Sequence, residues 1–289
     1  MSKIVKLYCE GKKDSLDYAI LEKLIPSNSI QIVPIGSKNS ANSIIHFLEF
    51  AKEGEIDNNI VDKANYYFFF RDRDFDKDLK DYPTSRLFTI PENNNGEIIG
   101  QICYGEKTTI ENYFFYPELF YEYIKDKKEG IRNKITSIDD VKEKFITAAQ
   151  KLKYYQATRY ALSKTPNSTI RLGNTWLDNS GKLPNNLTEQ ECQKTVKNLI
   201  ENKKAKVDNW TYDDFQTQYT HFLNVFNEPN FFEEEKFLVW FQGKDFEASL
   251  RKELGDFGGY YRFAKKHFDY KKFPDLIELR RLLEEKIKT

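Results

Sequence analysis

The chain has 289 residues, of which 45 are basic and 45 acidic, so its formal net charge is zero. This balance argues against a protein that coats nucleic acid without selectivity, because a strongly basic composition would then be expected. No apolar stretch approaches the ~20 residues needed to cross a membrane, and Met1-Ser2-Lys3 leads directly into a predicted strand without a signal peptide. We therefore expect a cytoplasmic protein that does not enter a membrane.

Few residues are available for thiol or imidazole chemistry. The three cysteines are widely spaced and form no Cys-x-x-Cys, which favours reduced thiols in the cytoplasm. The chain has only three histidines, so it offers few ligands for a zinc site and few candidates for the histidine of a Ser-His-Asp triad. The chain also lacks a Gly-x-x-x-x-Gly-Lys-Ser/Thr segment, so it is not expected to bind ATP through a P-loop.

The first part of the chain alternates predicted strands and helices. An apolar run at 4–9 is followed by a helix at 15–24, a strand at 29–35, a helix capped by Ser40 or Asn42, and a strand at 65–70. This β-α-β-α-β order predicts right-handed crossovers and a doubly wound, mostly parallel sheet with helices on both faces. Two short strands, at 86–90 and 98–104, are expected to pair as a hairpin through the turn 93–96.

The pattern changes to helices after about residue 125. Segment 111–115 is predicted as a strand or the edge of a helix, and a helix follows from Pro117 to Ile124. Further helices are predicted at 138–152, 154–162, 188–202, 212–226, 246–254, 260–267 and 276–287. We therefore predict an α/β domain at 1–125 and a helical substrate-binding or partner-binding region at 126–289.

Acidic residues occur where predicted strands end or begin. Glu10 closes the first strand, Asp72 and Asp74 follow the strand 65–70, and Glu111 opens the segment 111–115. Open α/β sheets bind ligands at the carboxyl ends of their strands. Two aspartates at i and i+2 of an extended segment project to one side, so Asp72 and Asp74 can share a cation that offsets their mutual repulsion. Carboxylates favour Mg²⁺, or Mn²⁺, over zinc.

Two further acidic residues lie close to these positions in the sequence. Asp76 occupies the next i+2 position after Asp74 and is a candidate for an outer contact with the cation. Asp14 lies in the first turn of the predicted helix 15–24, where it is either a metal ligand or a partner of the helix dipole.

The strand–Glu-Gly–helix segment followed by strand–Asp-x-Asp resembles the TOPRIM fold of topoisomerases, primases and OLD-type nucleases. Glu10 matches the glutamate of the TOPRIM first strand, and Asp72 and Asp74 match its Asp-x-Asp. The segment Ile110-Glu111-Asn112-Tyr113 is similar to the OLD-like branch, in particular to short TOPRIM effectors encoded beside an ABC-type ATPase in PARIS-type anti-phage systems. The resemblance covers residues 1–120. The chain departs from the family pattern in this segment. Arg73 stands between the two aspartates, and Phe75-Asp76 follows them, where the family usually has small residues.

This resemblance implies a Mg²⁺-dependent endonuclease of a Rossmann-like TOPRIM fold, acting as a defence effector that a partner ATPase holds silent. RNA, with tRNA as the family-implied substrate, is favoured over DNA. Glu10 would act as a general acid or base or as a ligand of a second metal, and Glu111 would complete the acidic cluster. Lys244, after Gly243, would match the active-site lysine of OLD-like nucleases and neutralise charge in the transition state. A homodimer is compatible with the sequence.

Basic residues near the acidic cluster and near the C-terminus are candidates for binding the substrate. Lys12 and Lys13 follow the Glu-Gly pair, and Lys265, Lys266, Lys271 and Lys272 are interleaved with aromatic residues between 260 and 273. Alternating cations and aromatics suit single-stranded or looped nucleic acid. The alternative is a solvated helix whose aromatic stripe faces the core, and this alternative is favoured.

Two other functions are compatible with the same residues. Arg73 could form salt bridges with both aspartates in place of a metal, which would make the chain a non-catalytic TOPRIM module that binds a partner or nucleic acid. A fragment of a primase or topoisomerase is a third interpretation, although no zinc ribbon or gate domain is evident in the sequence.

Overall fold

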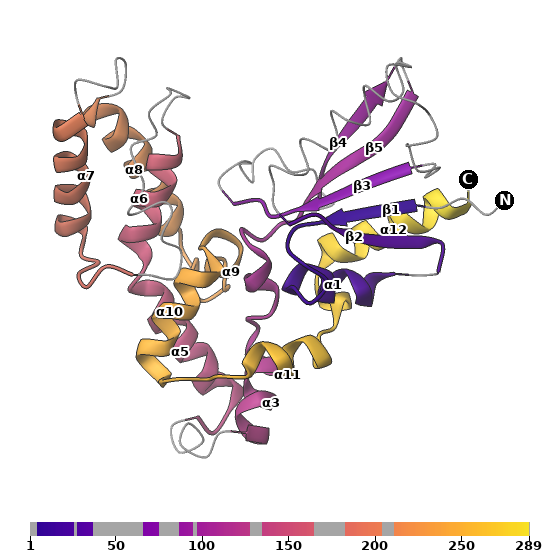
Figure 1. The fold of residues 1–289 in the computed structure, drawn as a ribbon. Coiled ribbons are helices and arrows are strands. Elements are labelled where there is room, and N and C mark those ends of the chain that lie inside the picture. The colour runs from indigo at the N-terminus through magenta and orange to yellow at the C-terminus, as the bar shows by residue number, and fades with distance from the viewer. Residues whose placement is uncertain are drawn as a thin grey trace. The chain divides into compact units, whose positions relative to one another are not determined.

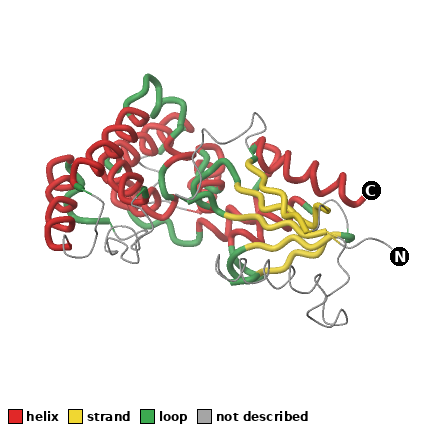
Figure 2. Tube along the Cα trace, turned by 90° about the horizontal axis from the view of Figure 1, so that it is seen from above, coloured by secondary structure: helices red, strands yellow, loops and turns green. Residues whose placement is uncertain are grey.

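The computed structural model describes residues 5–25, 28–36, 66–74, 87–94, 97–127, 135–164, 183–203 and 211–288. The chain divides into two compact units (Figures 1 and 2). Unit 1 comprises 1–110 together with 261–289, and unit 2 comprises 111–260. The domain division predicted from the sequence, at residue 125, stays a prediction; the boundaries of the two compact units fall after Ile110 and after Tyr260, so the C-terminal segment belongs to unit 1.

Unit 1 is built on a five-stranded sheet in the order β2-β1-β3-β5-β4. The sheet is parallel from β2 to β5, and β4 pairs with β5 in the antiparallel sense. The strands are β1 (Val5–Cys9), β2 (Ile30–Pro34), β3 (Tyr66–Arg71), β4 (Phe88–Asn94) and β5 (Glu97–Tyr104).

The residue pattern of β3 explains its central place in the sheet. All six of its residues, five of them aromatic, are buried, which requires cover on both faces of the strand. The predicted strands are confirmed to within a few residues, as is the hairpin of β4 and β5. The predicted helix after Ser40, the polar run 76–81 and Asp76 itself lie outside the described residues.

Helices from both ends of the chain pack near β1 and β2. Helix α1 (Leu16–Leu24) contacts β2, and α12 (Pro274–Lys288) contacts β1. The C-terminal elements of unit 1 also include most of α11 (Tyr260–His267) and the 3₁₀ helix η3 (Tyr270–Lys272). The buried leucines of α12 explain this packing, because they recur at helical spacing and form one apolar stripe.

Unit 2 is helical and has an aromatic core. Ring pairs such as Phe115–Phe246, Phe120–Phe145 and Tyr160–Phe222 connect helices that are distant in the sequence. Its elements are η2 (Ile110–Tyr113), α3 (Pro117–Lys127), α5 (Ile138–Gln150), α6 (Lys153–Ser163), α7 (Glu189–Lys203), α8 (Tyr212–Phe226), α9 (Phe237–Trp240) and α10 (Gly243–Leu254).

The helical prediction for unit 2 is largely confirmed, and the differences lie at η2, α9 and α10. Segment 111–115 was predicted as a strand or helix edge, but its first three residues belong to the 3₁₀ helix η2. Helix α9 was not predicted. Helix α10 begins three residues earlier than predicted, at Gly243. In the part of the chain that the structure describes, no helix is long and apolar enough to span a membrane.

Candidate functional site

Glu10 and Asp72 follow two strands that are direct neighbours in the parallel sheet. Strand β1 pairs with β3 in a register that sets Cys9 opposite Phe70. Glu10 comes one residue after Cys9, and Asp72 comes two residues after Phe70. Because parallel strands end at the same edge of a sheet, both carboxylates lie at the edge where such folds bind ligands. Both residues are partly exposed, so solvent reaches this edge, although the Oε1 atom of Glu10 is itself buried.

Gly11 makes the sharp turn that follows Glu10. Its φ is +79°, in the left-handed region that favours glycine, and it exchanges backbone hydrogen bonds with Gly36 at 3.0 and 3.3 Å. Ser15 then caps α1, accepting the Tyr18 N–H at 3.2 Å and donating to the Glu10 carbonyl oxygen at 3.5 Å. The backbone of Glu10 is thus tied to the start of α1.

Gly11→Ala should destabilise the protein. An added Cβ would meet the Ser15 Cβ at 2.6 Å, and the left-handed backbone alone costs about 1–2 kcal/mol for a non-glycine residue. We expect a lower urea midpoint with an unchanged m-value. Gly36→Ala is the control for the backbone term, because its φ is +84° but no atom lies within 4 Å of the added Cβ. Equal losses in the two variants would contradict the steric part of this prediction.

The segment after β3 turns away from the extended conformation. Strand β3 ends at Arg71, and Asp74 has a φ of 45°, so the argument that two aspartates project to one side of an extended strand does not hold here. This backbone is held against the loop after β5, because the Asp74 N–H donates to the Thr108 carbonyl oxygen at 2.7 Å. The aspartates are therefore placed by a fixed turn rather than by the strand.

Arg73 is fully buried and is directed at the loop that follows β5. Its Nε donates to the Glu106 carbonyl oxygen at 3.1 Å, and its Nη2 donates to Thr108 Oγ1 at 2.9 Å. The Glu106 N–H in turn donates to the buried carboxylate of Asp275, at the start of α12, at 2.9 Å. Arg73 thus has a structural role, joining the turn that carries Asp72 and Asp74 to the end of β5.

Asp17 is an acidic residue near Glu10 that the sequence analysis did not single out. It lies in the first turn of α1 but is buried, and its Oδ2 lies 3.8 Å from the position of a Cβ built on Gly11. Burial, together with the charges of Asp17 and Glu10, raises the pKa of the Cys9 thiol to about 12. Burial and the two nearby carboxylates thus disfavour the Cys9 thiolate. An acidic residue in the first turn of a helix usually indicates only a favourable interaction with the helix dipole, so the position of Asp17 in the sequence did not point to this site.

The donors at this edge fit Mg²⁺ in chemical type. Carboxylates are available from Glu10, Asp72 and Asp74, and Mg²⁺ typically uses one or two protein carboxylates while keeping several waters. Within the described ranges, no group of three or more His, Cys, Asp or Glu side chains is close enough to hold a metal ion. The fit is therefore to a cation that is largely hydrated, and the metal-ligand assignment stays a prediction.

Predicted substrate-binding lysines also belong to unit 1. Lys12 and Lys13 are exposed in the turn after Gly11. Lys265 of α11 donates a hydrogen bond to the Asp14 carbonyl oxygen, which brings α11 beside the same turn. The lysines at 265, 266, 271 and 272 were assigned from the sequence to the C-terminal helical region, but they lie in the unit that contains the sheet.

The phenylalanines among these lysines face the protein interior. Phe263 and Phe268 are buried, whereas Lys266, Lys271 and Lys272 are exposed. Phe268 stacks on Phe273 with the ring centroids 5.4 Å apart. These phenylalanines are therefore not available for base stacking, whereas Tyr261 and Tyr270 of the same stretch are partly exposed.

Glu111 and Lys244 contact each other within unit 2. Lys244 Nζ lies 3.6 Å from Glu111 Oε1; the Lys244 side chain is 60% exposed and that of Glu111 is 11% exposed. Gly243 is buried and begins helix α10, and Lys244 lies in the first turn of that helix.

A buried polar network fixes the segment that carries Lys244. Arg159 forms an ion pair with Asp245, and the Gln156 Nε2 donates to the same carboxylate at 2.8 Å. The Gln156 Oε1 accepts the Gln242 N–H at 3.3 Å. The Tyr160 hydroxyl donates to the Trp240 carbonyl oxygen at 2.6 Å, and the Asn112 side-chain amide donates to the Phe241 carbonyl oxygen at 2.9 Å. Lys244 therefore projects from a rigidly held backbone.

Comparison with known proteins adds no relative. No protein-family model matches the chain, and a search of curated proteins finds no significant match. The candidate site is therefore defined by the geometry above and by the sequence motif.

Proposed function

We propose that the chain is a metal-dependent nuclease of the TOPRIM, OLD-like class. One observation carries the proposal: β1 and β3 are adjacent parallel strands, so Glu10 and the Asp72–Asp74 turn follow neighbouring carboxyl ends. In this fold class, that edge is where phosphate-bearing ligands bind. The left-handed Gly11 beside Glu10 supports the proposal, because it leaves the backbone of the turn without a side chain.

Each residue has a defined part in the proposed reaction. Asp72 and Asp74 hold the cation, and their turn is kept in place by Arg73 and Thr108. A bound Mg²⁺ would orient the phosphodiester and polarise its phosphoryl oxygen. Glu10 moves the proton of the attacking water or the leaving oxygen, or serves a second cation. Glu111 and Lys244 pair in unit 2, and their participation rests on the family resemblance.

RNA, with tRNA first, is the proposed substrate, and DNA is second. The zero net charge favours a folded or looped RNA over long duplex DNA, because a duplex binder usually has a strongly basic surface. By the same resemblance, an ABC-type ATPase partner would control the nuclease. A partner is physically reasonable because the sequence carries no P-loop of its own.

An incubation series tests the proposal. Purified protein is mixed with tRNA, plasmid DNA or single-stranded DNA, each with Mg²⁺, Mn²⁺ or EDTA. We expect cleavage of tRNA with Mg²⁺ or Mn²⁺ and none with EDTA. Metal-independent cleavage would remove the metal from the proposal. No cleavage of any substrate, with and without the co-expressed partner, would overturn the nuclease itself.

The basic side chains of α11 and η3 should govern binding rather than turnover. Replacing Lys265, Lys266, Lys271 and Lys272 by alanine together should weaken tRNA binding and flatten its salt dependence. Each lost phosphate contact lowers the slope of log K against log salt by about 0.7 for single strands. Binding is measured with the Asp72→Ala protein to prevent cleavage. Replacing Lys142, Lys194 and Lys197 of unit 2 is the control and should leave the slope unchanged.

The second candidate function is a TOPRIM-like module that binds nucleic acid or a partner without cleaving it. It is favoured by Arg73, whose buried positive charge stands between the two aspartates. The hydrogen bonds of Arg73 to Glu106 and Thr108 weigh against it, because they direct the guanidinium to the β5 loop. Tight tRNA binding without cleavage under every metal condition would select this candidate.

A further inference from the structure

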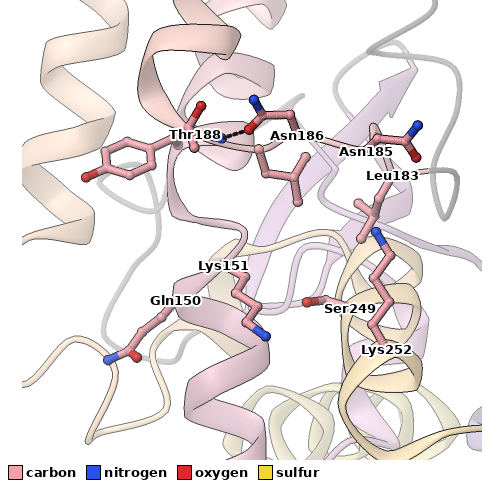
Figure 3. Close-up of a pocket in the computed structure, with 10 residues that line it drawn as sticks. Gln150, Lys151, Leu183, Asn185, Asn186, Thr188, Ser249 and Lys252 are labelled. Atoms are coloured by element: carbon pink, nitrogen blue, oxygen red, sulfur yellow. Dashed lines mark hydrogen bonds between the residues drawn. The ribbon is translucent and has the colours of Figure 1, made fainter.

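Unit 2 contains a cavity of about 400 Å³ between α5, α6, α10 and the segment that leads into α7 (Figure 3). Its volume lies in the range of sites for small organic ligands, about 300–1,000 Å³. None of the residues assigned to the proposed nuclease lines it. The lining residues are Gln150, Lys151, Tyr154, Leu183, Asn185, Asn186, Leu187, Thr188, Ser249 and Lys252.

The lining carries positive charge without a carboxylate. Lys151 and Lys252 both line the cavity, and Figure 3 shows Lys252 reaching from α10 toward Leu183. The Lys151 ammonium pairs with Glu253, which is not part of the lining, and no described residue forms an ion pair with Lys252. Lys153, just outside, places its ammonium 4.9 Å from the centroid of the Tyr154 ring. The cavity is therefore suited to an anion.

The rest of the lining combines apolar surface with amide groups. Leu183, Leu187 and the Tyr154 ring provide apolar surface, while Gln150, Asn185 and Asn186 provide groups that can both donate and accept hydrogen bonds. A phosphate alone would leave the apolar surface unused, and an apolar ligand would leave the exposed ammonium of Lys252 without an anionic partner among the described residues. A ligand that has an anionic end and a flat heterocycle with hydrogen-bonding edges satisfies both parts.

Two hydrogen bonds indicate that the walls are preformed. Ser249 is almost fully buried, and its hydroxyl donates to the Ala148 carbonyl oxygen at 2.8 Å, which joins α10 to α5. The Asn186 Oδ1 accepts the Thr188 N–H at 3.0 Å, which fixes the start of α7 (Figure 3). A cavity whose walls are already ordered costs less conformational entropy to fill.

We propose that this cavity binds a nucleoside monophosphate unit, with the phosphate between Lys151 and Lys252 and the base against the leucines and the amides. The unit is either a free nucleotide or one nucleotide of an RNA strand. The site goes beyond the proposed nuclease, because it uses no residue of the sheet edge and no metal.

Calorimetry with AMP as the probe, in buffer with EDTA, tests the site. We expect one AMP to bind per chain, and adenosine and inorganic phosphate each to bind at least about tenfold more weakly, because each lacks half of the recognised groups. Lys252→Glu should reduce AMP affinity by more than about tenfold, since it reverses the charge that no described residue pairs. Lys142→Glu, on exposed α5 surface, is the control and should bind AMP as wild type does.

The outcomes separate this site from the nuclease. Absence of saturable AMP binding, or equal binding by Lys252→Glu, would overturn the proposal. If an RNA oligonucleotide displaces AMP, and if its own binding is lost in Lys252→Glu, the natural ligand is one nucleotide of an RNA strand. If the oligonucleotide does not compete with AMP, the ligand is a free nucleotide. Binding of AMP should persist in Asp72→Ala, so a chain without nuclease activity can still possess this site.

Discussion

Replacing Asp72 or Asp74 with alanine should abolish cleavage while leaving the fold intact. Both aspartates are partly exposed and lie in a turn whose backbone is held by the Asp74–Thr108 hydrogen bond, which involves no aspartate side chain. Losing a group that stabilises transition-state charge typically costs about 10²–10³ in rate, and loss of a cation should cost no less. The measurement is single-turnover tRNA cleavage across a range of Mg²⁺ concentrations.

Controls separate chemistry from folding in this experiment. Glu22→Ala removes an exposed carboxylate from α1 of the same unit and should cleave as wild type does. Circular dichroism and the thermal midpoint of the aspartate variants should stay close to wild type, because like charges are being removed from one turn. Full activity in both aspartate variants would remove the metal site from the proposal. Partial rescue by higher Mg²⁺ would support it.

The architecture of the sheet was largely predictable from the sequence, because its signals are local. A continuous apolar run such as 65–70 is typical of a strand buried on both faces, and the asparagine-rich turn between β4 and β5 is typical of a hairpin. The same alternation of strands and helices predicted that Glu10 and Asp72 come directly after strands. The turn at Asp74 was not predictable, because its conformation depends on a hydrogen bond to Thr108 in a loop that is far along the chain.

The return of the C-terminal segment to unit 1 had no local signal. The amphipathic pattern of α12 predicts a buried face but does not say which element covers it. Contacts such as Asp275 with the Glu106 N–H, or Lys265 with the Asp14 carbonyl oxygen, join residues that are 169 and 251 positions apart. The lysines of α11 were thus recognised as candidates for substrate binding, and they belong to the compact unit that contains the sheet.

Buried charges were also missed by sequence reasoning. Arg159 and Asp245 look like ordinary polar positions in two amphipathic helices, and they are 86 residues apart. Their side chains are only 1% and 0% exposed. A charged residue on the solvent side of a helix and a charged residue paired in the core interrupt the apolar pattern in the same way. The spacing of apolar residues in either helix therefore does not tell the two kinds of charged residue apart.

Arg159→Met should therefore cause a large loss of stability in the full-length chain. Removing one partner of a buried ion pair leaves an uncompensated charge and typically costs about 3–5 kcal/mol. Here the buried carboxylate of Asp245 would lose its cationic partner and keep the hydrogen bond from Gln156. Urea unfolding followed by circular dichroism should show a lower midpoint, accompanied by loosening of the α6–α10 packing in hydrogen exchange.

A second substitution and a surface control show whether charge is the cause. Adding Asp245→Leu to Arg159→Met should recover part of the lost stability, because replacing both partners by apolar groups is often close to neutral. Lys244→Ala, one residue away but largely exposed, should change the free energy of unfolding by no more than about 0.5 kcal/mol. If Arg159→Met were as stable as Lys244→Ala, the ion pair would contribute nothing to the core of unit 2. The double variant could instead be clearly less stable than Arg159→Met. In that case, the loss of stability in Arg159→Met would come from altered packing and not from the unpaired charge.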